Sequence, residues 1–224
     1  MFTIAEQLLL LGLHDEKGSV VLSASTALPY GLAGATILDL YFQKRIKFED
    51  KNIHVVDHTP TGNNILDETL DLLCNATKIR DAKYWVNRVH GKVKGLQGRL
   101  ADRLVEKNIL AKEEHRLLWV FNYSRYPTQD FSPEYDIRNT IRNIVLYDQQ
   151  PTEKEAALIS LVKACELVNE IFSREERKTA KKKIKMITEE DEVGQAISTI
   201  VSEITAAITI AIVTAATAAS SASN

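Results

Sequence analysis

The sequence predicts a mainly α-helical single domain over residues 1–219, with one or two small β-hairpins and a disordered tail at 220–224. Three features predict this fold. Capping signatures recur ahead of apolar stretches, apolar residues follow helical spacing through most of the chain, and only short stretches alternate with a period of two. With 224 residues, of which 45% are hydrophobic, the chain can bury a core without disulfides or structural metals.

The first part of the chain is expected to surround one apolar helix. Thr3 and Glu6 have the spacing of a capping box, which predicts a first helix ending near Leu11. A short β-type run at 20–22 follows. Segment 30–46 (YGLAGATILDLYFQKRI) is apolar nearly all round, and exposed apolar surface costs roughly 25 cal/mol per Å². We therefore predict that this segment is the central buried helix.

The remaining elements follow from periodicity and capping. Alternating residues around the polar turn 49–52 predict a β-hairpin. The run 117–121 (LLWVF) is a second β candidate after a connector at 109–116. Further helices are predicted from Asn64, over 82–89, 96–108, 132–147, 155–172 and 174–187, and after the acidic run 189–192. The almost uncharged stretch 204–219 is too short for a membrane span and is expected to pack on the domain, with a membrane-associated tail as the alternative.

Signatures of catalysis, metal binding and secretion are lacking in the sequence. Gly31 and Gly34 fit neither a P-loop nor GxGxxG and are expected to serve helix packing. Cys74 and Cys165 have no CxxC partners and are expected to lack a nearby base. The N-terminus has no basic stretch of the kind found in signal peptides. We expect a cytoplasmic protein without metal, cofactor or catalytic residues. An enzyme acting on a phosphorylated small molecule is a third, open interpretation.

Two basic clusters are the stronger functional signal. The first interleaves glycines with cations and contains Asp81 and Asp102 as its acids; the second has Glu175 and Glu176 beside it. Flexible backbone among cations favours an anionic headgroup, and each basic residue near an anionic membrane contributes about 1 kcal/mol. A solvated helix face is the alternative for both. The basic residues are Lys78, Arg80, Lys83, Arg88, Lys92, Lys94, Arg99 and Arg103 in the first cluster, and Arg174, Arg177, Lys178, Lys181, Lys182, Lys183 and Lys185 in the second.

Four motifs in sequence carry a family resemblance. They are the leucine run 8–13, segment 30–46, Pro60-Thr61-Gly62 with Leu66-Asp67-Glu68, and the run 99–107 (RLADRLVEK). Together these motifs resemble the Golgi phosphoprotein 3 family, from about residue 3 to 215. The resemblance implies a mainly α-helical, non-enzymatic peripheral membrane protein. In eukaryotes the family binds phosphatidylinositol 4-phosphate on Golgi membranes and acts as an adaptor that retains glycosyltransferases through the vesicle coat.

The resemblance also implies a β-hairpin, here near 117–126, that inserts into the membrane or mediates oligomerisation. Its aromatic residues are Trp119, Phe121, Tyr123 and Tyr126. Aromatic rings of this kind suit a membrane interface or a protein contact.

At the positions that correspond to the family's phosphoinositide pocket, the chain carries Ala24, Ala33, Lys94 and Gln97. Of these only Lys94 is charged, and lysine does not reproduce the two-pronged grip of arginine on phosphate. The family's basic, coat-binding N-terminal arm has no counterpart before the first predicted helix. Both departures lead us to expect a bacterial or otherwise non-Golgi member.

The leading hypothesis is therefore a peripheral membrane protein whose Lys92, Lys94, Arg99 and Arg45 bind an anionic lipid headgroup. The alternative is an interaction or scaffold protein that forms homo-oligomers through the aromatic hairpin or binds other proteins with it. The net charge of −2 argues against nucleic acid as a partner.

Overall fold

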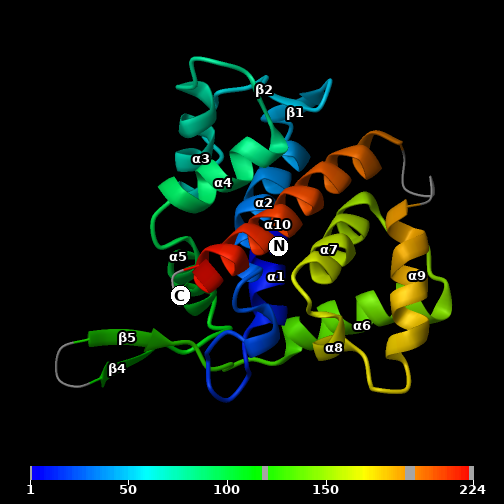
Figure 1. Cartoon of the computed structure of the whole chain (residues 1–224). Coiled ribbons are helices and arrows are strands. Elements are labelled where there is room, and N and C mark those ends of the chain that lie inside the picture. The colour runs from blue at the N-terminus through cyan, green and yellow to red at the C-terminus, as the bar shows by residue number, and fades with distance from the viewer. Residues whose placement is uncertain (1, 118–120, 190–194, 222–224) are drawn as a thin grey trace.

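The computed structural model describes residues 2–117, 121–189 and 195–221 (Figure 1). It is mainly α-helical with two small antiparallel sheets, which confirms the predicted fold class. The helices are α1 (Ile4–Gly12), α2 (Leu28–Phe42), α3 (Asn64–Cys74), α4 (Ala82–Lys92), α5 (Leu96–Glu106), α6 (Ser132–Tyr147), α7 (Glu153–Ala164), α8 (Val168–Ile171), α9 (Arg177–Glu189) and α10 (Gln195–Ser221). The predicted β-type run 20–22 is wrong as a strand: it contributes one bridge, from Val20 to Leu13, and then a 3-10 turn at Leu22–Ala24.

Helix α2 is the centre of the molecule. Eleven of its 15 residues are buried, and α1, α3, α4, α5, α7 and α10 all pack against it. Figure 1 shows α10 crossing α2, with α1 beside it. The helix ends four residues earlier than predicted, because Lys44 adopts a left-handed φ of 59° and Ile46 already begins a strand. The prediction of a central buried helix is confirmed, with a shorter C-terminus.

Two glycines let neighbouring helices approach α2 closely. A Cβ at Gly31 would lie 2.2 Å from the Sγ of buried Cys165, and one at Gly34 would lie 2.6 Å from Ile204 of α10. Atoms cannot approach so closely, so a side chain at either position would displace a packed helix. The predicted packing role of these glycines is confirmed.

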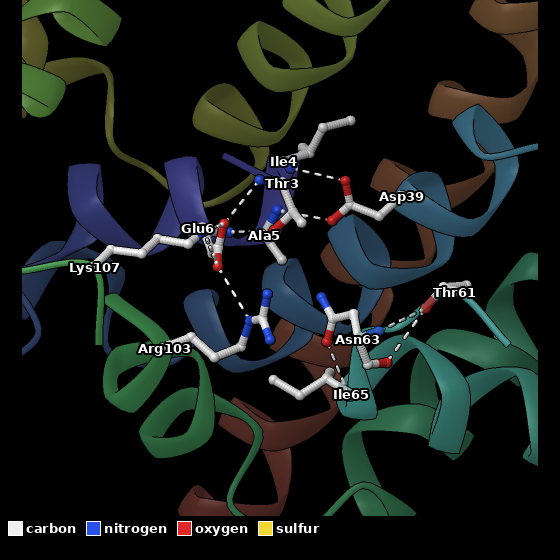
Figure 2. Close-up of polar contacts among 10 residues, drawn as sticks. All are labelled: Thr3, Ile4, Ala5, Glu6, Asp39, Thr61, Asn63, Ile65, Arg103 and Lys107. Atoms are coloured by element: carbon white, nitrogen blue, oxygen red, sulfur yellow. Dashed lines mark hydrogen bonds and ion pairs between the residues drawn. The ribbon is translucent and has the colours of Figure 1, made fainter. Parts of the chain in front are cut away.

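Two buried carboxylates hold the start of α1 in place (Figure 2). Thr3 and Glu6 form the predicted capping box. Asp39 of α2 accepts hydrogen bonds from the backbone N–H groups of Ile4 (2.8 Å) and Ala5 (3.1 Å). Burial raises the pKa of Asp39 to about 7, although these two N–H groups act to lower it. Asp39 therefore serves as a cap for the first helix, supplied by the central one.

The first sheet lies at the far end of α2. Strands β1 (Ile46–Glu49) and β2 (Asn52–Val55) form the predicted hairpin around Asp50 and Lys51, which both have positive φ. Two central residues with positive φ match the tight turns that hairpins favour. A third strand, β3 (Arg80–Asp81), pairs with β2. It was not predicted, since two exposed residues show no period-two pattern.

The second sheet is a hairpin of β4 (Glu113–Leu117) and β5 (Phe121–Arg125). Leu117 ends β4 and pairs with Phe121, which begins β5, so the β candidate 117–121 contributes to two strands rather than forming one. The hairpin expected near 117–126 is present, with its strands at 113–117 and 121–125. The predicted connector 109–116 contains most of β4. Residues 118–120, with Trp119, lie outside the described part of the chain.

The C-terminal helices differ from prediction at one break. The single helix expected over 155–172 divides into α7 and α8, where Glu166 takes a φ of 60°. Helix α10 buries Ile204 and Ile208 against α2 but leaves Val213 58% exposed. Within the described ranges, no helix is long and apolar enough to cross a membrane. Helix α10 continues to Ser221, and the rest of the predicted tail, 222–224, lies outside those ranges.

Alanine substitution at two helical glycines tests the packing around α2. Gly31→Ala should lower the free energy of unfolding by about 1–3 kcal/mol, because the new methyl group collides with Cys165. Gly91→Ala in α4 is the matched control, since a Cβ there meets nothing within 4 Å. It should raise stability by about 0.5–1 kcal/mol, as expected when alanine replaces glycine in a helix. Urea unfolding measures both; equal stability of Gly31→Ala and wild type would contradict this packing.

Candidate functional site

A pocket of about 320 Å³ opens where three helix ends meet. The first turn of α2 forms one wall, the last turn of α4 forms another, and the loop into α5 closes the site. The lining residues are Pro29, Leu32, His90, Gly91, Val93, Lys94, Gly95, Leu96, Gln97 and Gly98. The pocket therefore combines an apolar wall with the glycine-broken, basic segment that the sequence singles out.

The backbone at the start of α5 favours an anion. Gly95 is the N-cap residue, has a left-handed φ of 64° and provides no side-chain cap for the helix. The first N–H groups of a helix have no partner within it and carry the positive end of the helix dipole. Lys94 is exposed beside them and forms an ion pair with no described residue. Helix N–H groups with an adjacent cation are a common binding arrangement for phosphate.

Two rings flank the pocket. The imidazole of His90 stacks on Tyr30 of α2 in a tilted arrangement, with 4.1 Å between ring centroids. Partial burial lowers the pKa of His90 below the usual range for histidine. His90 is therefore mostly neutral at neutral pH in the unliganded protein. His90 was not among the predicted site residues, because its position beside Lys94 depends on how α4 ends.

Ion pairs from distant acids fix the orientation of α5. Arg99 pairs with Glu68 of α3. Arg103 and Lys107 both pair with Glu6 of α1, whose side chain is fully buried, at 3.2 and 2.7 Å (Figure 2). Within the sequence of the first basic cluster, the acids are Asp81 and Asp102. The acids that neutralise Arg99, Arg103 and Lys107 instead come from other helices. Part of the first basic cluster is thus structural.

Of the four residues predicted to bind a headgroup, only Lys94 lines the pocket. Lys92 is exposed at the C-terminal end of α4, and Arg99 faces Glu68. Arg45 pairs with Asp57 beyond the opposite end of α2, a helix roughly 22 Å long at 1.5 Å per residue. The structure therefore does not bring Arg45 together with Lys94.

The positions matched to the family's phosphoinositide pocket also separate into two pairs. Lys94 and Gln97 line the pocket. Ala24 and Ala33 are completely buried in the core. Of these four positions, the two at the pocket therefore contribute one lysine and one neutral amide to its lining.

The hairpin β4–β5 projects from the helical body (Figure 1). Tyr123 is 41% exposed and lies between His115, whose ring stacks on it at 5.4 Å, and Arg125. Tyr126 instead lies at the base, where it is buried and its hydroxyl donates to Asp102 at 3.2 Å. Of the four predicted hairpin aromatics, Tyr123 thus occupies the projecting part and Tyr126 the core; Trp119 lies outside the described residues, and of Phe121 the structure gives only the backbone pairing.

The second basic cluster lies on and before α9, in an element that does not contact the pocket. Glu176, one of the acids beside this cluster, pairs with Arg142 of α6, and Lys183 of the cluster pairs with Asp148. Lys178, Lys181 and Lys182 are exposed on α9. Lys181 borders a hollow of about 330 Å³ that Glu166 also lines, and Lys183 borders one of about 170 Å³ together with Asp148, so a carboxylate accompanies the cation in both.

Groups with catalytic potential serve other roles in the described residues. Asp39 caps α1, Asp67 accepts from Thr61, and Glu68 pairs with Arg99, so these three carboxylates do not form one site. The expectation that Cys74 lacks a nearby base is wrong, since its Sγ lies 3.2 Å from Nδ1 of His58. Burial nevertheless raises the pKa of the Cys74 thiol, which leaves it a weak nucleophile.

Metal binding has no support in the ranges that the structure describes. They contain no group of three or more histidine, cysteine, aspartate or glutamate side chains close enough to hold a metal ion.

A larger hollow of about 540 Å³ lies between α7 and α10. Its walls are mainly hydroxyl and small apolar side chains, and its charged residues, Lys163 and Glu166, have opposite signs. The pocket at α5 is the better candidate for an anion, because a cation and free helix N–H groups converge there.

Comparison with known proteins agrees with this architecture. The family model described as Golgi phosphoprotein 3 (GPP34) matches residues 4–204. The chain is 25% identical over 164 residues to vacuolar protein sorting-associated protein 74 of Schizosaccharomyces pombe, which covers 64% of this chain and 48% of the relative. It is 26% identical over 165 residues to the protein of the same name from Eremothecium gossypii, and this aligned region covers 64% of this chain and 49% of the relative. The chain thus aligns with about half the length of each relative.

Proposed function

The chain belongs to the Golgi phosphoprotein 3 family, and from this premise we propose that it is a non-enzymatic peripheral membrane protein that binds an anionic, phosphate-bearing lipid headgroup. The observation that carries the proposal is the pocket at the start of α5, where Lys94 meets the uncapped helix N-terminus. The relatives are named for vacuolar protein sorting, which agrees with a role at membranes.

The proposed binding is broad among phosphate headgroups. Lys94 offers a point charge and Gln97 offers a neutral amide, and the described residues that line the pocket include no arginine. Without the bidentate geometry of arginine, the site distinguishes phosphate arrangements poorly. Helix N–H groups bind any phosphate oxygen placed before them. We therefore propose charge-dependent recognition of anionic membranes rather than selection of one phosphoinositide.

The membrane attachment is proposed to be reversible and electrostatic. Each basic residue close to an anionic surface contributes about 1 kcal/mol, and salt screens this attraction within about 10 Å at 0.1 M. Exposed Lys92 lies close enough in sequence to Lys94 to add to it. Binding should weaken as ionic strength rises.

Flotation with phosphatidylcholine vesicles, with and without phosphatidylglycerol, tests the proposal at low salt. Wild type should float only with the anionic vesicles, and Lys94→Gln should weaken binding about fivefold, the effect of one basic residue near the surface. Lys181→Gln on α9 is the matched control, since it removes an equal charge from the other basic cluster. Equal flotation with both vesicle types, or a loss caused by Lys181→Gln and not by Lys94→Gln, would sink the proposal.

A second candidate function is a scaffold that forms oligomers through the hairpin β4–β5. It is favoured by the projection of this hairpin from the body and by the exposure of Tyr123 on it (Figure 1). Native mass spectrometry should then show an oligomer for wild type and a monomer for Trp119→Ala and Phe121→Ala. A monomer in every case would count against the scaffold.

A further inference from the structure

His90 lines the pocket from an exposed position on α4. It lies in the last turn of α4, is exposed, and lines the hollow together with Lys94 and Gln97. Its ring rests on Tyr30, which limits the directions in which the imidazole can turn. A ring held at the rim of a pocket can present a nitrogen to whatever occupies the pocket.

Among the described residues, the charged groups that neighbour His90 in sequence are cations. The end of its own helix and the loop after it supply Lys92 and Lys94, and α2 supplies Tyr30, whereas Arg88 lines a different hollow. Arg99 of α5 is tied to Glu68. Helix α10, which packs on α4, carries Glu203 as its charged residue, and this side chain pairs with Lys51. No described carboxylate therefore stabilises a charged imidazole at this position before a ligand enters.

We infer that His90 is a second phosphate-binding side chain of this pocket and that it takes up a proton as the anion binds. The inference rests on the proposed function of the pocket. A neutral imidazole offers one N–H donor, whereas the imidazolium offers two donors and a positive charge. The bound phosphate supplies the negative charge that the protein lacks there. His90, Lys94 and the first N–H groups of α5 then bind the anion together.

Proton uptake makes binding depend on pH in a defined direction. Burial lowers the pKa of His90 in the free protein, and a bound anion raises it, because an opposite charge favours the protonated form. Affinity should therefore increase as pH falls through the range in which histidine titrates. This behaviour separates a ligand-binding histidine from one that only packs against Tyr30.

Vesicles of phosphatidylglycerol provide the test, because the charge of a phosphodiester stays constant between about pH 5.5 and about pH 8, across the titration of histidine. Wild type should bind about fivefold more tightly at the lower pH, the gain from one added cation. His90→Gln should lose this increase, and His90→Lys should bind equally well at both values. His54→Gln, on β2 at the far end of α2, is the control and should behave as wild type.

The possible outcomes separate the two proposals. If wild type binds, Lys94→Gln weakens it and His90→Gln keeps the full pH dependence, the role of His90 is wrong and the pocket stands. If wild type fails to bind anionic vesicles at either pH, the proposed function fails as well. NMR titration of the His90 imidazole with and without glycerol phosphate gives a second readout on the wild-type protein. An unchanged His90 pKa at a glycerol phosphate concentration that shifts the amides of the pocket would overturn the inference.

Discussion

The burial of α2 on all sides is the constraint on which the rest of the structure depends. A helix without a polar face has to be covered completely, and six other helices cover it. Gly31 and Gly34 allow this cover to be close, and Asp39 ties the start of α1 to it through two backbone hydrogen bonds. The first turn of the same helix forms a wall of the pocket. The position of the candidate site therefore follows from the packing of the core.

Ion pairs between helices then place α5 so that its N-terminus faces this wall. Glu6 is fully buried and holds Arg103 and Lys107, while Glu68 holds Arg99 (Figure 2 shows the contacts of Glu6). Removing one partner of such a buried pair is costly, because the remaining charge is left without compensation. The charges of α5 thus serve its orientation, and the charge available to a ligand comes from Lys94 in the loop before it.

Local signals made much of this structure predictable. The capping boxes at Thr3 and Thr152 begin helices as predicted, and the apolar run 30–46 contains the central helix. Features that depend on partners far away in sequence were not predictable. Strand β3 is such a feature, because Arg80 and Asp81 form a strand only by pairing with β2. Two local features were also missed: the pairing of Leu117 with Phe121, which divides an apparent strand between the two sides of a hairpin, and the break at Glu166.

The candidate site was likewise predictable only in the features that depend on neighbouring residues in the sequence. The glycines and Lys94 were visible as a basic, flexible segment, but the neutralising partners of Arg45 and Arg99 lie in other elements. His90 becomes part of the site only because α4 ends against α2.

The central claim is that Lys94 and the start of α5 bind the anion. An NMR titration of ¹⁵N-labelled protein with glycerol phosphate tests it most directly: the account predicts the largest amide shifts at residues 94–98. Shifts centred on α9, or none at these five amides, would contradict it.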